Sequence, residues 1–316
     1  MKKFLKAVFV GIVLLVLADV AAAFYFLHVA LAKTTCVEDE YDVWQREKQR
    51  VPFAAAWLDS IRDNNCLLDL LQQNAQGRTL HAYWLCAPKP TKRTAILLHG
   101  YRNQALNMLH IAYMYSQFGF NVLMPDFFGH GLSEGTHVRM GWRDRNDVIM
   151  WAHVADSLLQ GAEITVHGIS MGAATTMMVA GENPRGIVAY VEDCGYTSVW
   201  DEFESEFRKR YGLPSFPLLH TSSALCFLLD GWTFGRASAL EAVKRSRAPM
   251  LFIHGDADDF VPTWMATPLY NAKSGMRELW LSPGVGHAAS YDKFPAEYTS
   301  CVRNFLQKAY NSSLSE

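Results

Sequence analysis

The stretch of sequence that decides the fold is residues 164–181, ITVHGISMGAATTMMVAG. Its first three residues are apolar or β-branched, as is typical of a strand, and from Met171 onward small and apolar residues follow one another with the spacing of a helix. The turn between them, residues 168–172, reads G-x-S-x-G with Ser170 at its centre. In this context the pattern predicts a tight, strained turn that exposes the serine hydroxyl beside the N–H groups of a helix N-terminus.

The same alternation of strand and helix extends over most of the chain. Short apolar runs predict strands at 94–98, 121–124, 164–166, 187–191, 250–253 and 278–281, and helical spacing occurs at 106–118, 143–159, 171–181, 263–274 and 295–309. Nearly continuous apolar strands that alternate with helices predict the α/β class, with a mostly parallel sheet covered by helices on both faces. Residues 66–71 and 79–86 predict an antiparallel hairpin at one edge.

One interval breaks this rhythm. The residues between the strands at 187–191 and 250–253 are rich in large aromatic side chains: Trp200, Phe203, Phe207, Tyr211, Phe216, Phe227, Trp232 and Phe234. A single crossover helix needs fewer of them, so we predict a small helical cap at about 198–247. The alternative is one longer covering helix with its own core contacts.

The N-terminus has the character of a membrane-targeting segment. Three lysines, Lys2, Lys3 and Lys6, precede an apolar run at 7–32 that is longer than the ~20 residues needed to cross a bilayer. Asp19 lies near the centre of this run, and its insertion cost of about 3 kcal/mol is outweighed by the surrounding apolar side chains. We predict a transmembrane signal anchor at 1–33. The alternatives are a signal peptide cleaved after the alanines at 21–23, and a buried core helix.

This prediction has a consequence for topology and for the cysteines. The lysines stay cytoplasmic, and the rest of the chain is membrane-anchored and extracytoplasmic, or secreted if the signal is cleaved. Disulfides survive in such a compartment. Cys66 and Cys86 face each other across the predicted hairpin, which leaves two possibilities, a cross-strand bridge or two buried thiols.

The remaining divisions that we predict are a stem and lead-in helix at 34–65, a main domain at 66–310 and a tail at 311–316.

Charge and composition argue against a nucleic-acid partner and against a metal site. The chain has 29 basic and 31 acidic residues and a formal net charge of -2, so it has no overall field that would attract nucleic acid. No CxxC pattern and no Cys/His cluster with metal-ligand spacing occurs, and we therefore expect neither a metal nor another cofactor.

A serine hydroxyl becomes a good nucleophile only when a base removes its proton, and that base must be oriented by an acid. Three acids, Asp256, Asp258 and Asp259, follow the predicted strand at 250–253, and His287 follows the next strand. Serine, acid and histidine thus occur in the chain order that is typical of one large group of hydrolases.

These motifs resemble those of the α/β-hydrolase superfamily, over about residues 66–310. Within it, the chain is similar to bacterial membrane-anchored hydrolases of the serine aminopeptidase and lipase-like branch. The resemblance covers H-G-x-x-D-x-x-V-P at 254–262, which selects Asp258 as the acid and leaves Asp256 and Asp259 as turn-capping or solvated residues. It also covers G-x-G-H, which ends at His287. It implies a catalytic triad of Ser170, Asp258 and His287.

The resemblance also implies an oxyanion hole. The backbone N–H of Met171 is the first donor, and the sequence Leu-Leu-His-Gly-Tyr at 97–101 resembles the loop that supplies the second, from Tyr101. Residues 126–133 are similar to a further family motif, D-x-R-G-H-G-x-S, except that Phe128 stands in place of the arginine. Asp193 is either a spare acid near the site or a structural residue.

The predicted function is that of a serine hydrolase, a carboxylesterase that acts on a small-molecule ester through an acyl-enzyme. The same residues would serve a serine aminopeptidase or a thioesterase, because fold does not determine substrate. A third possibility is a non-catalytic, membrane-tethered binding protein.

Overall fold

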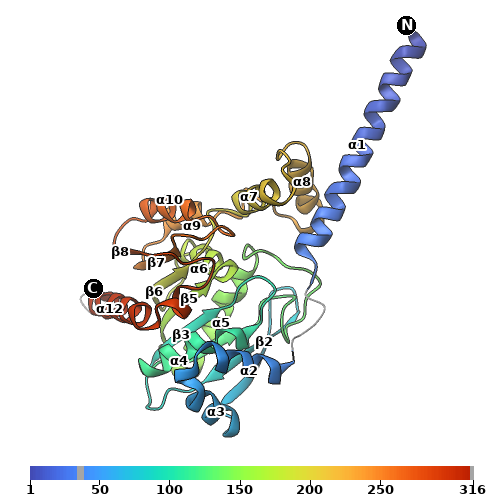
Figure 1. Ribbon diagram of the computed structural model, residues 1–316. Helices are drawn as coiled ribbons and strands as arrows, with labels where there is room; N and C mark the ends of the chain where they lie inside the picture. The colour runs from blue at the N-terminus through green and yellow to red at the C-terminus, as the bar shows by residue number, and fades with distance from the viewer. Residues whose placement is uncertain (34–38, 314–316) are drawn as a thin grey trace.

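The computed structural model describes residues 1–33 and 39–313 (Figure 1). Its centre is a single eight-stranded sheet with the strand order β1-β2-β4-β3-β5-β6-β7-β8. The strands are β1 (Leu67–Gln73), β2 (Thr79–Leu85), β3 (Arg93–Leu98), β4 (Asn121–Pro125), β5 (Glu163–Ile169), β6 (Ile187–Asp193), β7 (Met250–Gly255) and β8 (Arg277–Ser282).

Only β2 runs opposite to the other strands of the sheet. β2 pairs antiparallel with both β1 and β4, and every other neighbouring pair is parallel. The prediction of a mostly parallel sheet with an antiparallel hairpin at one edge is therefore confirmed. Because parallel strands all end at the same edge, the loops after β3, β5, β7 and β8 meet there.

Helices cover both faces of the sheet, as predicted. One face packs against α5 (Asp144–Leu159), α6 (Met171–Ala180), α9 (Ala239–Arg245) and α10 (Ala266–Ala272). The other packs against α2 (Glu40–Arg50), α3 (Ala55–Asp63), α4 (Leu109–Gln117) and α12 (Pro295–Ser313). The remaining short helices are η1 (Pro52–Ala54), η2 (Ala105–Met108), η3 (Thr263–Met265) and α11 (Ser290–Lys293). The two apolar cores hold the sheet rigidly and thereby determine the positions of its loop residues.

The lead-in segment differs from the single helix that the sequence suggested. It consists of α2 and α3 with η1 between them, because Pro52 has no N–H to continue the α-helical hydrogen-bond pattern of α2. The predicted stem includes residues 34–38, which lie outside the described residues.

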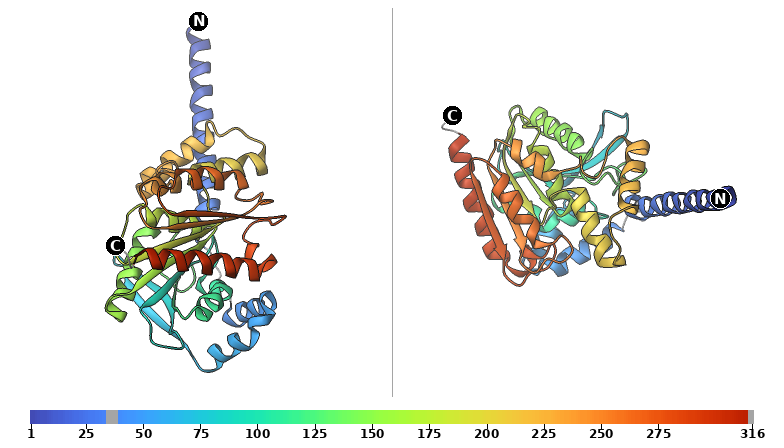
Figure 2. Two further views of the ribbon diagram at one scale, coloured as in Figure 1. Left: turned by 90° about the vertical axis from the view of Figure 1, so that its left-hand side faces the viewer. Right: turned by 90° about the horizontal axis from the view of Figure 1, so that it is seen from above.

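The aromatic interval is helical, and the prediction of a small helical cap is confirmed. We call α7 (Val199–Tyr211) and α8 (Leu218–Asp230) the cap; α9, which also belongs to the interval, packs instead on α6 of the main domain. The cap is the part of the body that lies next to α1 (Lys2–Leu31) in both views of Figure 2.

Helix α1 has two parts that differ in exposure. From Lys2 to Ala18 its side chains are exposed, and this part extends away from the body (Figure 1). Beyond it, Ala23, Leu27 and Leu31 are buried at helical spacing, and the two leucines pack in the main core. Among the described residues, α1 is the one helix long and apolar enough to cross a membrane, by length and composition.

Asp19 marks the boundary between these two parts. Its carboxylate accepts a hydrogen bond of 2.5 Å from the hydroxyl of Thr221 in α8. The sequence alone suggested an acid in the middle of a lipid-embedded helix; in the structure, the acid instead lies where the helix joins the cap and has a polar partner there.

The two cysteines of the hairpin are opposite each other, next to the paired residues Leu67 and Leu85. The possible bridge is not formed, since both Cys66 and Cys86 are free thiols. Both are also exposed, so the alternative of two buried thiols is wrong. The reason is that the hairpin lies at the open edge of the sheet, where the outermost strand leaves side chains in solvent.

Candidate active site

The turn after β5 holds Ser170 in a strained conformation, with φ 58° and ψ −119°. The two glycines of the motif allow this turn because they leave no side chain in its way. A Cβ at Gly168 would collide with the carbonyl oxygen of Gly172, and a Cβ at Gly172 would collide with that of Leu98 in β3. Close backbone approach is thus the physical reason for the G-x-S-x-G spacing.

The structure brings together the three residues that the sequence singled out from distant loops. The Nε2 atom of His287 lies 2.8 Å from the hydroxyl oxygen of Ser170, and its Nδ1 atom lies 2.8 Å from a carboxylate oxygen of Asp258. Ser170 and Asp258 are buried, and the side chain of His287 is 21% exposed. Such a chain of hydrogen bonds can move a proton from the hydroxyl to the imidazole while the carboxylate stabilises the resulting charge.

Electrostatics keep Asp258 ionised. Burial alone would raise its pKa, but hydrogen bonds from His254 and His287 and the charges of the two imidazoles lower the pKa of Asp258 to about 2. One of its oxygens also accepts the N–H groups of Phe260 and Val261. The carboxylate is therefore fixed in orientation as well as in charge.

His254 is a neighbour of this acid whose importance the sequence did not reveal. Its ring lies at 3.5 Å from Asp258, and its Nε2 atom bonds the carbonyl oxygen of Val261 at 2.9 Å. Burial would lower the pKa of His254, but hydrogen bonding to Asp258 and the charge of Glu192 raise it. The H-G pair before the acid was the available signal, because it places His254 at the end of β7, beside the loop of Asp258.

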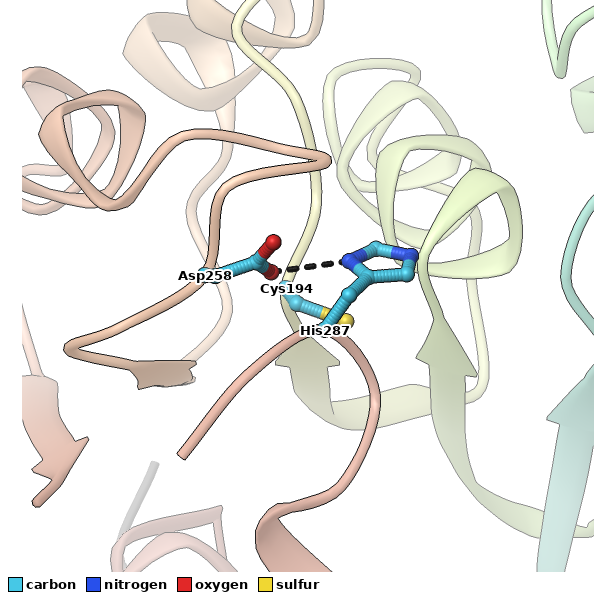
Figure 3. Close-up of side chains that lie close together, drawn as sticks. All are labelled: Cys194, Asp258 and His287. Atoms are coloured by element: carbon cyan, nitrogen blue, oxygen red, sulfur yellow. Dashed lines mark hydrogen bonds and ion pairs between the residues drawn. The ribbon is translucent and has the colours of Figure 1, made fainter. Parts of the chain in front are cut away.

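Cys194 lies beside the acid and the imidazole, after β6 (Figure 3). Its sulfur and ligand atoms of Asp258 and His287 all lie within 4.8 Å of one another. Burial raises the pKa of the Cys194 thiol well above its usual range, which keeps it neutral. Within the part of the chain that the structure describes, this is the one group with metal-ligand geometry, and its histidine is already hydrogen-bonded to Asp258 and Ser170.

The two predicted oxyanion donors lie beside the serine. Met171 is the first residue of α6, so its N–H has no acceptor within the helix. A Cβ at Gly100 would lie 3.5 Å from the Cβ of Ser170, which shows how closely the loop after β3 approaches the serine. Tyr101, Ser170 and Met171 line the same cavity.

That cavity has a volume of ≈ 310 Å³ and is lined mainly by three parts of the chain. The main domain contributes Ser170 and the loops around it, α7 contributes Phe203 and Phe207, and α1 contributes Phe26. The tyrosine ring of residue 101 lines the cavity rather than facing solvent alone, and its hydroxyl donates a 2.6 Å hydrogen bond to the carbonyl oxygen of Ala30 in α1.

One acid in the cavity wall was not predicted. Glu202 of α7 is 4% exposed, and its Oε2 atom has no hydrogen-bond partner among the described residues. Burial raises the pKa of Glu202 well above its usual range. Nothing in its local sequence distinguishes it from the other acids of α7, because only the fold brings it to the cavity that Ser170 also lines.

The acids next to Asp258 and the histidines outside the motifs have other roles. Asp256 accepts the N–H of Gly284 at 2.6 Å in a turn, and Asp259 is exposed and paired with Lys209, so both interpretations are confirmed. Of the histidines outside the motifs, His81 and His110 are buried and hydrogen-bonded to acids. The other two, His153 and His220, are exposed.

Asp193, the last residue of β6, supports the serine turn. The carbonyl oxygen of Asp193 accepts the N–H of Ser170 at 2.8 Å, and its carboxylate accepts the hydroxyl of Tyr298 at 3.0 Å. Burial raises the pKa of Asp193 to about 6 and that of its neighbour Glu192 to about 8. These contacts favour the structural interpretation of Asp193.

Comparison with known proteins places these features in context. Residues 89–210 match the protein family described as serine aminopeptidase, S33; the match includes Ser170 and ends before Asp258. The chain is 31% identical over 246 residues to the uncharacterized protein YqkD of Bacillus subtilis, a region that makes up 76% of this chain and 79% of that protein. It is 26% identical to the uncharacterized membrane protein YNL320W of Saccharomyces cerevisiae, over 72% of this chain and 75% of that one.

Solved structures show the same architecture. The esterase Pf2001 of Pyrococcus furiosus is similar in fold with a TM-score of 0.64 and 22% identity, over 79% of this chain and 95% of that chain.

Proposed function

Because this chain belongs to the α/β-hydrolase superfamily, we propose that it is a serine hydrolase that cleaves carboxylic esters, with Ser170, His287 and Asp258 as its catalytic triad. The observation that carries the proposal is the continuous hydrogen-bonded chain Ser170–His287–Asp258, with both distances at 2.8 Å. Ser170 lines a mostly apolar cavity, which supports an organic ester as substrate.

The proposed reaction has two halves. The oxygen of Ser170 bonds to the ester carbonyl carbon while its proton passes to Nε2 of His287, and the N–H groups of Tyr101 and Met171 hold the oxyanion. The imidazolium then gives that proton to the leaving alcohol as the C–O bond breaks. Water repeats the sequence on the acyl-enzyme and releases the acid, which returns Ser170 to its free form.

We also propose that α1 remains part of the mature protein as a signal anchor, with the body on the extracytoplasmic side. The burial of Ala23, Leu27 and Leu31 in the core supports retention, because cleavage near residues 21–23 would remove the start of this packed stripe. Alkaline extraction of membranes and determination of the mature N-terminus test it. A secreted protein that begins near residue 24 would contradict the anchor.

The test of the reaction uses the full chain in detergent micelles. A fluorophosphonate probe should label the wild type and the control Ser300→Ala, whose hydroxyl lies exposed on α12, and should not label Ser170→Ala. p-Nitrophenyl esters should turn over faster than aminoacyl anilides. A wild type that neither reacts with the probe nor hydrolyses any ester would favour the non-catalytic binding protein instead.

One observation favours a second candidate function, cleavage of aminoacyl bonds. Glu202 lines the cavity, and its buried Oε2 atom, which has no hydrogen-bond partner among the described residues, is available to the ammonium group of an aminoacyl substrate. If so, Glu202→Gln should raise KM for aminoacyl anilides by at least about tenfold and leave KM for acetate esters unchanged. Equal effects on both substrates would exclude this role for the acid.

A further inference from the structure

The cavity above Ser170 has a wall that comes from the membrane-targeting helix itself. Ala22, Phe26 and Val29 of α1 line it, together with Phe203 and Phe207 of α7. We propose that the substrate is an acyl ester that resides in the lipid bilayer, and that its hydrocarbon chain reaches Ser170 from the membrane between α1 and α7. This inference rests on the proposed function and specifies its substrate class.

The contact between the two helices is formed by aromatic rings. Phe26 meets the rings of Phe203 and Phe207 edge to face, with centroids 5.7 and 5.8 Å apart. These ring contacts are apolar and involve no hydrogen bond. A hydrocarbon chain can therefore replace them without leaving a polar group unsatisfied. We call the seam between α1 and α7 the portal.

The length of the free part of α1 determines where the portal lies relative to the bilayer. From Lys2 to Ala18 the helix is about 25 Å long at ~1.5 Å per residue, which is less than the ~30 Å of a hydrocarbon core. The segment can therefore span the bilayer only if the junction at Asp19 is drawn to the membrane surface. The hydrogen bond from Thr221 satisfies that carboxylate at this depth.

The cap supplies the surface that would meet the lipid. Large apolar side chains on α8 and on the connection from α7 are at least 48% exposed: Leu213, Phe216, Phe227, Leu228 and Leu229. Figure 2 shows the cap as the part of the body nearest to the free half of α1. Exposed apolar groups this dense are unfavourable in water and are typical of a surface that enters a membrane interface.

The polar residues of the cavity fit an amphiphile rather than a plain hydrocarbon. Arg102 lines it together with Glu206 and Arg210, which are ion-paired at 2.6 Å. A polar headgroup thus has charged partners, while the acyl chain has the aromatic and aliphatic wall of α1 and α7.

The test uses the full chain reconstituted in phosphatidylcholine vesicles, with two probes, p-nitrophenyl palmitate dissolved in the bilayer and water-soluble p-nitrophenyl acetate. The key variant is Ala22→Trp, which fills the portal from an exposed position of α1. Its matched control is Ala21→Trp, which is also exposed but does not line the cavity.

We expect Ala22→Trp to lower the ratio of palmitate to acetate turnover by at least about tenfold and Ala21→Trp to leave this ratio within about twofold of the wild type. Val29→Trp, from a second lining position that is 42% exposed, should reproduce the effect if Ala22→Trp fails to fold. An unchanged ratio in both portal variants overturns the proposal.

A second comparison distinguishes entry of the substrate from the bilayer from simple binding of its acyl chain. Palmitate turnover, relative to acetate, should be higher in vesicles than in detergent micelles, and the opposite order would contradict entry from a bilayer. Acetate turnover that persists in Ser170→Ala would instead overturn the proposed function itself, so the two failures are distinguishable.

Discussion

The hydroxyl of Tyr101 donates a 2.6 Å hydrogen bond to the carbonyl oxygen of Ala30, near the end of α1. The next residue, Arg102, donates a 2.8 Å bond to the carbonyl oxygen of Val29. Both acceptors belong to the last turn, where a helix has no N–H groups of its own to satisfy them. The loop that carries one proposed oxyanion donor is therefore attached to the end of α1.

Tyr101→Phe tests this attachment. The variant keeps the ring in the cavity and the backbone N–H, but it removes the bond to Ala30. We expect kcat for p-nitrophenyl acetate to fall by about fivefold with little change in KM, because the oxyanion donor is less well positioned. The free energy of unfolding should fall by about 1 kcal/mol. Steady-state kinetics and urea denaturation measure these effects. Tyr41→Phe, at a ring that is 65% exposed, is the control, and an unchanged kcat in Tyr101→Phe would contradict the coupling.

Asp258→Asn tests the orientation of His287. The amide has the shape of the carboxylate, but it cannot stabilise the imidazolium and it favours the wrong tautomer. We expect kcat to fall by about 10³- to 10⁴-fold while KM changes little. The same substitution at the neighbouring acids, Asp256→Asn and Asp259→Asn, should leave kcat within about twofold. If either neighbour proved as sensitive as residue 258, the assignment of the acid would be wrong.

Gly172→Ala tests the close approach beneath the serine turn. The added methyl group would collide with the carbonyl oxygens of Leu98 and His99, which are backbone atoms rather than the ends of flexible side chains. We expect a loss of about 2 kcal/mol or more in the free energy of unfolding, together with slower fluorophosphonate labelling. Gly235→Ala is the matched control, because nothing lies within 4 Å of the added atom. Equal stability of the two variants would refute the steric argument.

Glu192→Gln tests the effect of a buried acid on stability. Burial raises the pKa of Glu192 to about 8, so the folded protein keeps a proton that the unfolded chain releases near its ordinary pKa. Stability from this proton is fully present below the unfolded pKa and is lost as pH rises through about 8. Glutamine cannot ionise, and its amide oxygen can still accept the N–H of Gly195, as the carboxylate does.

We therefore expect the free energy of unfolding of the wild type to fall between pH 5 and pH 8 by on the order of 3 kcal/mol more than that of Glu192→Gln. Urea denaturation across this range measures the difference. Glu297→Gln, at an exposed position of α12, should follow the wild type. Parallel pH profiles for wild type and Glu192→Gln would show that the carboxyl is already ionised in the folded state, in partnership with His254.

The sequence by itself determined the sheet and the three site residues that we singled out. Each of these residues lies in a short motif whose chemistry is local: glycines permit the turn at Ser170, and polar residues follow the strands that precede Asp258 and His287. A parallel sheet then brings strand ends to one edge, so alternating apolar strands and helices were sufficient to predict that the loops meet.

Only the tertiary structure decided which residues surround the three site residues. Ala23, Leu27 and Leu31 have the composition of lipid-facing residues, and nothing in the sequence distinguishes them, because apolar side chains do not encode which surface they contact. The same holds for Glu202, which lines the cavity beside Ser170 only because of where α7 lies. Local patterns therefore specified the turns, whereas α1 became a wall of the cavity through long-range packing.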